Sequence, residues 1–268
     1  MIEILLAIFF ITVLLLFLSS GIWVAISMIG VSSIGMILFT SRPVGDAMAT
    51  TIWGASSSWT LTALPLFVWM GEILFRTKLS ENLFEGLAPW LQKLPGGLIH
   101  VNVVGCALFA AISGSSAATV ATVGKMSIPE LRKRKYPEKI LLGSLAGSGT
   151  LGLLIPPSII LIIYGVTVQE SIAKLFIAGI IPGIMIALIF MGYVIIWSLL
   201  NKNKMPLTEE NYSFLNKLSK SKQLIPVILL ILGVIGSIYT GIATAPEAAS
   251  MGVVGALILS YFQKSLNL

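Results

Sequence analysis

Two short segments combine hydroxyl side chains with glycine in a chain that offers little other polar chemistry. Residues 113–116 read SGSS, and residues 147–158 read GSGTLGLLIPPS. Hydroxyl and backbone carbonyl oxygens are hard ligands that suit cations such as sodium, whereas exposed helix N-termini attract anions. These segments therefore indicate binding and release of ions rather than the making of bonds.

The other reactive residue types are too few or too far apart to form a catalytic or metal site. One cysteine, Cys106, and one histidine, His100, exclude disulfides and clusters of thiolate or imidazole ligands. His100 lies about 20 Å from Ser113 along a helix and cannot activate it as a nucleophile, so an intramembrane enzyme is a remote alternative. Residues 147–152 match GxGxxG, but no strand precedes them, which excludes a dinucleotide site.

The composition excludes an ordinary water-soluble protein. Of 268 residues, 56% are hydrophobic and 10% are charged, and the mean hydropathy is +0.98. A soluble domain has about 25% charged residues, and this chain has too little polar surface to cover a soluble core. Because its apolar runs have the length of membrane-spanning helices, we predict an all-α polytopic membrane protein.

Several apolar segments approach the ~20 residues that a helix needs to cross a hydrocarbon core about 30 Å thick. They are residues 2–18, 21–40, 59–75, 140–167, 173–200, 223–240 and 246–263. The first run lacks the basic residues that precede the core of a secretory signal, so we predict a retained span. A signal peptide cleaved near residues 19–21 is the alternative.

Two elements are predicted to be irregular inside the membrane. Residues 99–113 and 116–128 are too short to cross, which indicates a re-entrant helical hairpin over about residues 99–128 with SGSS at its tip. Pro156 and Pro157 make a continuous helix over 140–167 improbable, so we predict a break within residues 147–157. Both irregular points fall at a similar depth, where their unpaired backbone groups must face protein or a water-filled cavity.

We predict a cation site, suited to sodium, where the hairpin tip meets the broken helix. Its ligands would be backbone and hydroxyl oxygens of Ser113, Gly114, Ser115, Ser116, Gly147, Gly149, Thr150 and Pro156. The alternative is that such small residues serve only helix packing. We favour packing for Gly179 to Gly183 and, taken alone, for Gly143 to Gly147.

The basic residues indicate the orientation of the chain. The net charge is +6 with a pI of about 9.5, and the densest basic cluster, LRKRKYPEK, spans residues 131–139. Basic residues accumulate in cytoplasmic loops, which places loops 76–98 and 201–222 on the same cytoplasmic side and Met1 outside. Of the 17 Lys and Arg residues, the exceptions are Arg42 and Lys174. Topology thus explains the basic balance, and nucleic acid is not expected as a partner.

Glu72 and Arg76 lie near the inner end of the predicted span 59–75. They are four residues apart with the acid first, the order that favours an ion pair on a helix. We predict such a pair. A proton-carrying carboxylate is the alternative, since an unpaired charge at the bilayer centre demands a functional reason.

The long polar stretch at residues 201–222 divides the chain. We predict a first membrane repeat over residues 1–200, a cytoplasmic linker over 201–222 and the start of a second repeat over 223–268. Residues 19–27, SSGIWVAIS, weakly resemble residues 239–250, YTGIATAPEAAS. The topology places these two segments on opposite faces, as an inverted repeat requires, although chance similarity is the alternative.

Five segments carry a specific resemblance that spans nearly the whole chain. They are residues 64–87, 94–137 with the SGSS tip, 147–165 with GSGTLGLLIPPS, 175–188 and 241–252 with GIATAPEAASMG. Together they resemble the large permease (DctM-like M) subunit of tripartite ATP-independent periplasmic (TRAP) transporters.

The resemblance implies an elevator-type secondary transporter of the cell inner membrane with two inverted repeats. It implies sodium as the coupling ion, no cofactor and no enzymatic activity. Its partners would be a small TRAP membrane subunit, a periplasmic solute-binding protein and an organic anion such as a C4-dicarboxylate, sialic acid or another sugar acid. The resemblance also places one sodium site at the first hairpin and broken helix. The residues expected to contact substrate are Ser116, Thr119 and Ser158.

The length departs from this family, which continues beyond the position of Leu268 through most of a second repeat. We expect a companion chain to supply that half, or the chain to be a truncated, non-transporting fragment that inserts and docks to partners. Without a complement, we expect no transport by this chain alone, since the substrate lies between the two halves. Uptake assays in vesicles reconstituted with this chain test that expectation, and sodium-dependent uptake would contradict it.

Overall fold

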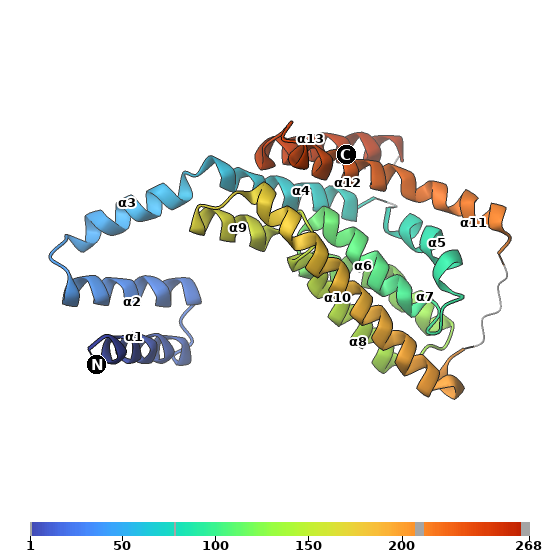
Figure 1. Cartoon of the computed structure of the whole chain (residues 1–268), viewed down its shortest axis with the longest axis horizontal. Coiled ribbons are helices and arrows are strands. Elements are labelled where there is room, and N and C mark those ends of the chain that lie inside the picture. Colours follow the sequence, from blue (N-terminus) through green and yellow to red (C-terminus); the bar gives the residue numbers. More distant parts are fainter. Residues whose placement is uncertain (1, 78, 207–211, 264–268) are drawn as a thin grey trace. The chain divides into compact units, whose positions relative to one another are not determined.

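The computed structural model describes residues 2–77, 79–206 and 212–263, which fold into helices and connecting turns without any strand in that part of the chain (Figure 1). The chain divides into two compact units, Met1–Ser57 and Ser58–Leu268. The helical content and the apolar helices confirm the prediction of an all-α polytopic membrane protein. Residues 207–211 of the predicted linker and 264–268 of the predicted second repeat lie outside the described residues.

The first unit contains three helices: α1 (Ile2–Ser19), α2 (Val24–Phe39) and α3 (Val44–Ser56). Glycines bring α1 and α2 close together, because a Cβ on Gly30 would lie 2.6 Å from the ring of Phe17. Most other side chains of this unit are exposed and apolar, as expected of helices that face lipid. The sequence did not predict α3 as a separate helix.

The second unit holds the hairpin and the broken helix. Its elements in chain order are η1 (Trp59–Thr62), α4 (Ala63–Phe75), α5 (Leu79–Leu91), α6 (Ile99–Ser113), α7 (Ser116–Lys133), α8 (Glu138–Gly149), η2 (Thr150–Leu153), α9 (Ile159–Val168), α10 (Ile172–Leu200), η3 (Lys202–Lys204), α11 (Phe214–Ser221), η4 (Lys222–Leu224), α12 (Ile225–Tyr239) and α13 (Ala245–Phe262).

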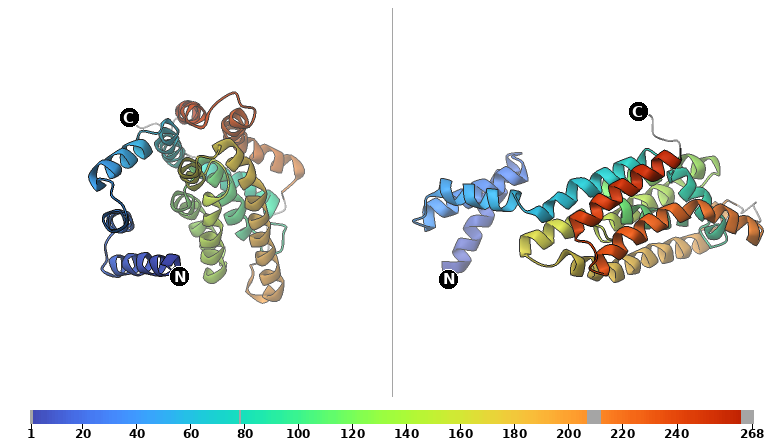
Figure 2. Two further views of the ribbon diagram at one scale, coloured as in Figure 1. Left: turned by 60° about the vertical axis from the view of Figure 1, so that its left-hand side comes forward. Right: turned by 90° about the horizontal axis from the view of Figure 1, so that it is seen from above.

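Helix α6 forms the centre of the second unit and is buried along almost its whole length. It packs against α7, α8, α10, α4 and α5 (Figures 1 and 2). Helix α4 lies along α13, where Gly252 approaches Met70 so closely that an added Cβ would lie 2.5 Å from its Sδ atom. The outer helices instead bury only one stripe each, and α10 exposes large side chains such as Ile181 and Leu188. The second unit thus has a buried central helix, and its outer helices expose the large apolar side chains that suit contact with lipid.

Only some of the predicted spans are single long helices. Among the described residues, Ile172–Leu200, Phe214–Tyr239 and Ala245–Phe262 are long and apolar enough to cross a membrane, and a fourth span is counted if Val44–Ser56 and Trp59–Phe75 act as one. The predicted spans 2–18 and 21–40 correspond to the shorter apolar helices α1 and α2. Residues 140–167 are interrupted as predicted, by η2 and the prolines.

Three polar segments are more helical than the sequence predicted. Helix α7 continues to Lys133, beyond the predicted end at residue 128. Helix α5 lies in the predicted loop 76–98, and α11 lies in the predicted linker. Both α5 and α11 are amphipathic, with polar residues between their apolar ones, so a search for continuous apolar runs does not detect them.

The polar connections between α5 and α6, between α7 and α8 and between α10 and α11 meet at one end of the second unit. Lys93, Tyr136 and Met205, one from each connection, line a cavity of about 260 Å³. Their meeting agrees with the prediction that these connections share one membrane face. Tyr136 joins two of these connections, because its buried hydroxyl accepts a 3.1 Å hydrogen bond from the Leu98 N–H. Burial raises the pKa of Tyr136.

We predict that Tyr136→Phe lowers the free energy of unfolding by about 1–3 kcal/mol, because it leaves the buried Leu98 N–H without its acceptor. Unfolding in detergent micelles, followed by circular dichroism, measures this loss. The matched control is Tyr193→Phe, since Tyr193 is 59% exposed on α10 and its replacement should change stability by under about 0.5 kcal/mol. Equal losses in the two variants would argue against the Tyr136 contact.

Candidate ion and substrate site

The hairpin tip is a tight reversal between two helices. Gly114 follows α6 in the left-handed conformation (φ 59°, ψ 8°), and its N–H donates a 3.0 Å hydrogen bond to the Ala110 carbonyl. Glycine adopts this conformation without the steric cost that a side chain imposes. Ser115 is extended and begins α7 by accepting a 3.4 Å hydrogen bond from the Ala118 N–H on its Oγ. The residue types of SGS thus specify the turn.

Hydroxyl groups fill the interior of the tip. The Oγ of Ser113 lies 3.0 Å from the Oγ1 of Thr119, and both residues are buried. The Ser113 hydroxyl also lies within hydrogen-bond distance, 3.3 Å, of the Ser115 carbonyl. The first turn of α7 is therefore joined to the last residue of α6 by side-chain oxygens.

The break in the second element runs from the end of α8 to the start of α9. Helix α8 ends at Gly149, the 3₁₀ turn η2 follows, and the Pro156–Pro157 peptide is cis. The buried Ser158 connects both sides of the break. Its hydroxyl donates a 2.6 Å hydrogen bond to the Leu153 carbonyl and accepts a 3.5 Å bond from the Leu161 N–H. Ser158 thereby begins α9 while holding the end of η2.

The tip and the break are in direct contact, and we call this contact the clasp. The Ile159 N–H at the start of α9 donates a 3.3 Å hydrogen bond to the Gly114 carbonyl. Gly152 of η2 packs on the Ser115–Ser116 peptide so closely that a Cβ would lie 2.9 Å from the Ser116 nitrogen. Two segments that leave helical geometry therefore satisfy and cover each other.

Glycines on neighbouring helices support the clasp from outside. A Cβ on Gly71 of α4 would lie 2.9 Å from the Ser113 Cα, and one on Gly179 of α10 would lie 2.7 Å from the Leu154 carbonyl oxygen. Gly183 similarly faces Ile155, which agrees with the packing role predicted for Gly179 and Gly183. The sequence analysis missed Gly71, although its signal was a lone glycine within the apolar run LFVWMGEILF.

The predicted ligands do not all lie in the clasp. Ser113 to Ser116 form the tip, Gly149 packs against Val120 of α7, and Ser158 lies between Pro157 and Ile159, which both adjoin Gly114. Gly147 instead faces the Phe190 ring of α10, and Pro156 lies near Gly179. The exposed Thr150 turns its hydroxyl back to the Gly147 carbonyl at 2.7 Å.

Four helix ends converge at the clasp. The carbonyl ends of α6 and η2 lie there with Ser113 and Leu153, and the N-termini of α7 and α9 begin there with Ser116 and Ile159. Carbonyl ends carry partial negative charge and N-termini partial positive charge. Within the described residues, no group of three or more His, Cys, Asp or Glu side chains forms a metal site. The clasp therefore offers oxygen donors for a hard cation beside N–H groups for an anion.

The predicted ion pair between Glu72 and Arg76 is confirmed. The Arg76 Nε lies 2.8 Å from the Glu72 Oε1 at the end of α4, and both side chains are largely exposed. The carboxylate is thus paired on its own helix.

Discontinuous helices that meet in an otherwise apolar helical protein are typical of membrane transport proteins. A family model described as "Tripartite ATP-independent periplasmic transporter, DctM component" matches residues 11–268. The chain belongs to this family.

Similarity to individual relatives extends over most of the chain. The chain is 33% identical over 234 residues to the C4-dicarboxylate TRAP transporter large permease protein DctM of Pseudomonas aeruginosa, and the match covers 87% of this chain and 54% of the relative. It is 33% identical to the sialic acid TRAP transporter large permease protein SiaM of Vibrio cholerae, covering 90% and 55%. It is 34% identical to the isethionate TRAP transporter permease protein DctMQ of Oleidesulfovibrio alaskensis, covering 92% and 38%. The chain thus spans about half the length, or less, of these relatives.

We predict that Gly152→Ala destabilises the fold by about 1–3 kcal/mol, because the new Cβ overlaps the Ser115–Ser116 peptide. The matched control is Gly143→Ala on α8, where nothing lies within 4 Å of the added Cβ. That substitution should be neutral or stabilising, since alanine favours helix. Thermal unfolding in micelles compares the two, and equal midpoints would contradict the contact.

Proposed function

We propose that the chain is the membrane permease subunit of a sodium-coupled TRAP secondary transporter that imports an organic anion. Family membership supports the transport role. The convergence of four helix ends at the clasp carries the proposal, because that arrangement offers complementary partial charges to a cation and an anion. Binding both together at one site is the physical requirement for coupling them.

Sodium would bind at the carbonyl ends and hydroxyls of the clasp. The proposed ligands at the clasp are the oxygens of Ser113, Gly114, Ser115, Ser116 and Gly149, whereas Gly147, Thr150 and Pro156 of the predicted set lie outside it. Ser115 and Ser116 are only half-buried, so an ion can reach them. Serine, threonine and carbonyl oxygens are hard donors, which favours an alkali cation over a soft transition metal.

The anion would bind at the N-termini of α7 and α9, with Ser116, Thr119 and Ser158 as its contacts. Both helices begin at the clasp, and the partial positive charge of a helix N-terminus attracts anions. The relatives named above are named for C4-dicarboxylate, sialic acid and isethionate, which all carry a carboxylate or sulfonate. We infer that the substrate of this chain has such a group.

The proposal places the chain in the cell inner membrane with its N-terminus outside. Its partners would be a small TRAP membrane subunit and a periplasmic solute-binding protein that delivers the anion. Because the chain spans about half of its large-subunit relatives, the transporting assembly would also include the second half of the permease. Uptake of a labelled organic anion into proteoliposomes containing all these parts, with and without sodium, tests the assembly.

We predict that sodium, compared with potassium at equal ionic strength, raises the unfolding midpoint of the purified chain. A ligand at 100 times its Kd stabilises the folded state by about 2.7 kcal/mol. Ser115→Ala should reduce this sodium increment, whereas Thr150→Ala should preserve it, because the exposed Thr150 hydroxyl bonds the Gly147 carbonyl outside the clasp. The increment is the readout because loss of the Ser115 cap lowers stability equally in both salts.

Thr167→Ala is the control for the sodium experiment. Thr167 is exposed on α9, and its hydroxyl bonds only to its own helix at Ile163, so the sodium increment should persist. An increment that is absent from the unmodified chain, or that survives Ser115→Ala, would refute the proposed ligands.

A further inference from the structure

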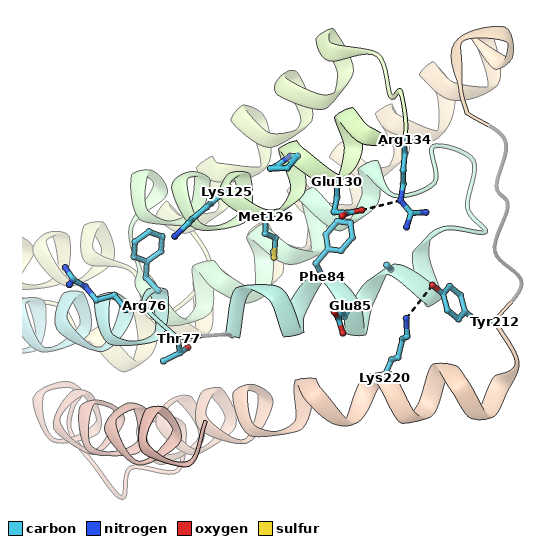
Figure 3. A pocket seen from close by; sticks show the side chains of 13 residues that line it. Arg76, Thr77, Phe84, Glu85, Lys125, Met126, Glu130, Arg134, Tyr212 and Lys220 are labelled. Atoms are coloured by element: carbon cyan, nitrogen blue, oxygen red, sulfur yellow. Dashed lines mark hydrogen bonds and ion pairs between the residues drawn. The ribbon is translucent and has the colours of Figure 1, made fainter. Parts of the chain in front are cut away.

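A cavity of about 840 Å³ lies beside α7, the second arm of the hairpin, and is also lined by α5, α11 and the end of α4. Figure 3 shows two polar contacts in its wall. The Arg134 Nε lies 3.5 Å from the Glu130 Oε2, and the Lys220 Nζ donates a 3.5 Å hydrogen bond to the Tyr212 hydroxyl. Each contact joins residues that are close in the sequence, so neither fixes one helix against another.

A buried asparagine makes a contact of that kind for α6, the first arm of the hairpin. Asn102 lies in the first turn of α6 and is fully buried. Its Nδ2 donates a 3.2 Å hydrogen bond to the Leu141 carbonyl and a 3.0 Å bond to the Ser144 Oγ, both on α8. The Ser144 hydroxyl in turn donates a 2.9 Å bond to the Leu141 carbonyl. Within the described residues, Asn102 provides the only side-chain hydrogen bonds between α6 and α8.

These hydrogen bonds add direction to a contact that otherwise has little. Leu141 and Leu145 lie on the buried face of α8 together with Ser148 and Gly149. Apolar contacts tolerate a small shift of one helix along another, because the hydrophobic effect is not directional. The N–H groups of a buried amide do not, because losing an acceptor leaves a polar group unpaired. A single buried asparagine sets the register of paired helices in coiled coils.

The register at Asn102 determines where the two helices end. Helices α6 and α8 both begin near this contact and both end at the clasp, so they run side by side in the same direction. The clasp lies about 16 Å along α6 from Asn102 and about 12 Å along α8 from Leu141. A slip of one residue moves one helix end by about 1.5 Å relative to the other. The hydrogen bond from the Ile159 N–H to the Gly114 carbonyl is already 3.3 Å long, so such a slip exceeds its tolerance.

We propose that Asn102 is a positioning residue, which sets the register of α6 against α8 and thereby holds the hairpin tip opposite the break. Asn102 does not touch the clasp and acts through the two helices that end there. The inference rests on the proposed function only in treating the clasp as an ion site, since the clasp oxygens can share an ion only while tip and break meet.

Hydrogen exchange of the full chain in micelles, followed by mass spectrometry without sodium, tests the proposal. Asn102→Leu keeps a side chain of similar size and removes both donors. We expect the Ile159 amide to exchange at least about tenfold faster in this variant, because its contact with the Gly114 carbonyl opens. Unchanged exchange at Ile159 would overturn the proposal.

The matched control is Val234→Ala, which leaves a cavity on the buried face of α12, the helix that packs against α13. It lowers stability without removing a hydrogen bond of α6 or α8. At temperatures equally far below the two unfolding midpoints, exchange at Ile159 in this control should stay within about twofold of the unmodified chain. Equal acceleration in Asn102→Leu and Val234→Ala would show general loosening and refute a specific role for Asn102.

A milder variant covers the case in which Asn102→Leu fails to fold. Ser144→Ala removes one acceptor and keeps the Leu141 carbonyl, so we expect exchange at Ile159 to rise about threefold. Where Asn102→Leu folds, adding Ser144→Ala to it should change nothing further, because the two residues act in one contact. Effects that multiply independently would contradict that shared contact.

Asn102→Leu should also reduce the sodium increment of the unfolding midpoint. This readout separates the two proposals, because exchange at Ile159 is measured without sodium. A chain that lacks the increment before any substitution would refute the ion site, and exchange at Ile159 would still decide whether Asn102 positions the tip.

Discussion

The structure depends on giving hydrogen-bond partners to backbone groups that leave helical geometry inside the membrane, and the bond from the Ile159 N–H to the Gly114 carbonyl does so. In lipid, a backbone group without a partner costs several kcal/mol, yet an ion site needs backbone that is not helical. The chain leaves helical geometry twice near the core of the second unit, at the hairpin tip and at the Pro156–Pro157 break, and it places the two departures against each other. The Gly114 carbonyl and the Ile159 N–H thereby satisfy each other where the two departures meet.

Glycines let the surrounding helices approach the backbone of the clasp closely, which excludes lipid from it. Gly71, Gly152 and Gly179 each lie where a methyl group would overlap main-chain atoms of the clasp. Helix α6 carries the tip from within the buried centre. Helix α13 buries a stripe of mostly small residues, α10 buries one that also includes Ile172 and Phe176, and both expose large apolar residues. The closest packing thus surrounds the clasp, whereas the outer surface consists of large apolar side chains without such close contacts.

Sequence reasoning located the irregular elements because their residue types violate helical rules. Two adjacent prolines and a Gly-Ser tip between short apolar runs indicate a break and a turn without reference to tertiary structure. Contacts between elements were not accessible in that way. The pairing of Ile159 with Gly114, the role of Gly71 and the outward position of Thr150 depend on how helices pack in three dimensions. Helices α5 and α11 escaped detection because polar residues interrupt their apolar positions, so neither forms a continuous apolar run.

The clasp is built almost wholly from main-chain atoms: the Gly114 carbonyl, the Ile159 amide and the Ser115–Ser116 peptide facing Gly152. Substitutions at positions 116 and 159 would therefore leave that backbone contact in place, whereas Ser115 also caps α7 through its side chain. Main-chain atoms of these residues hold the contact, whereas their side chains would determine what binds there. A scaffold of this kind can diversify its chemistry by single substitutions while its backbone stays fixed.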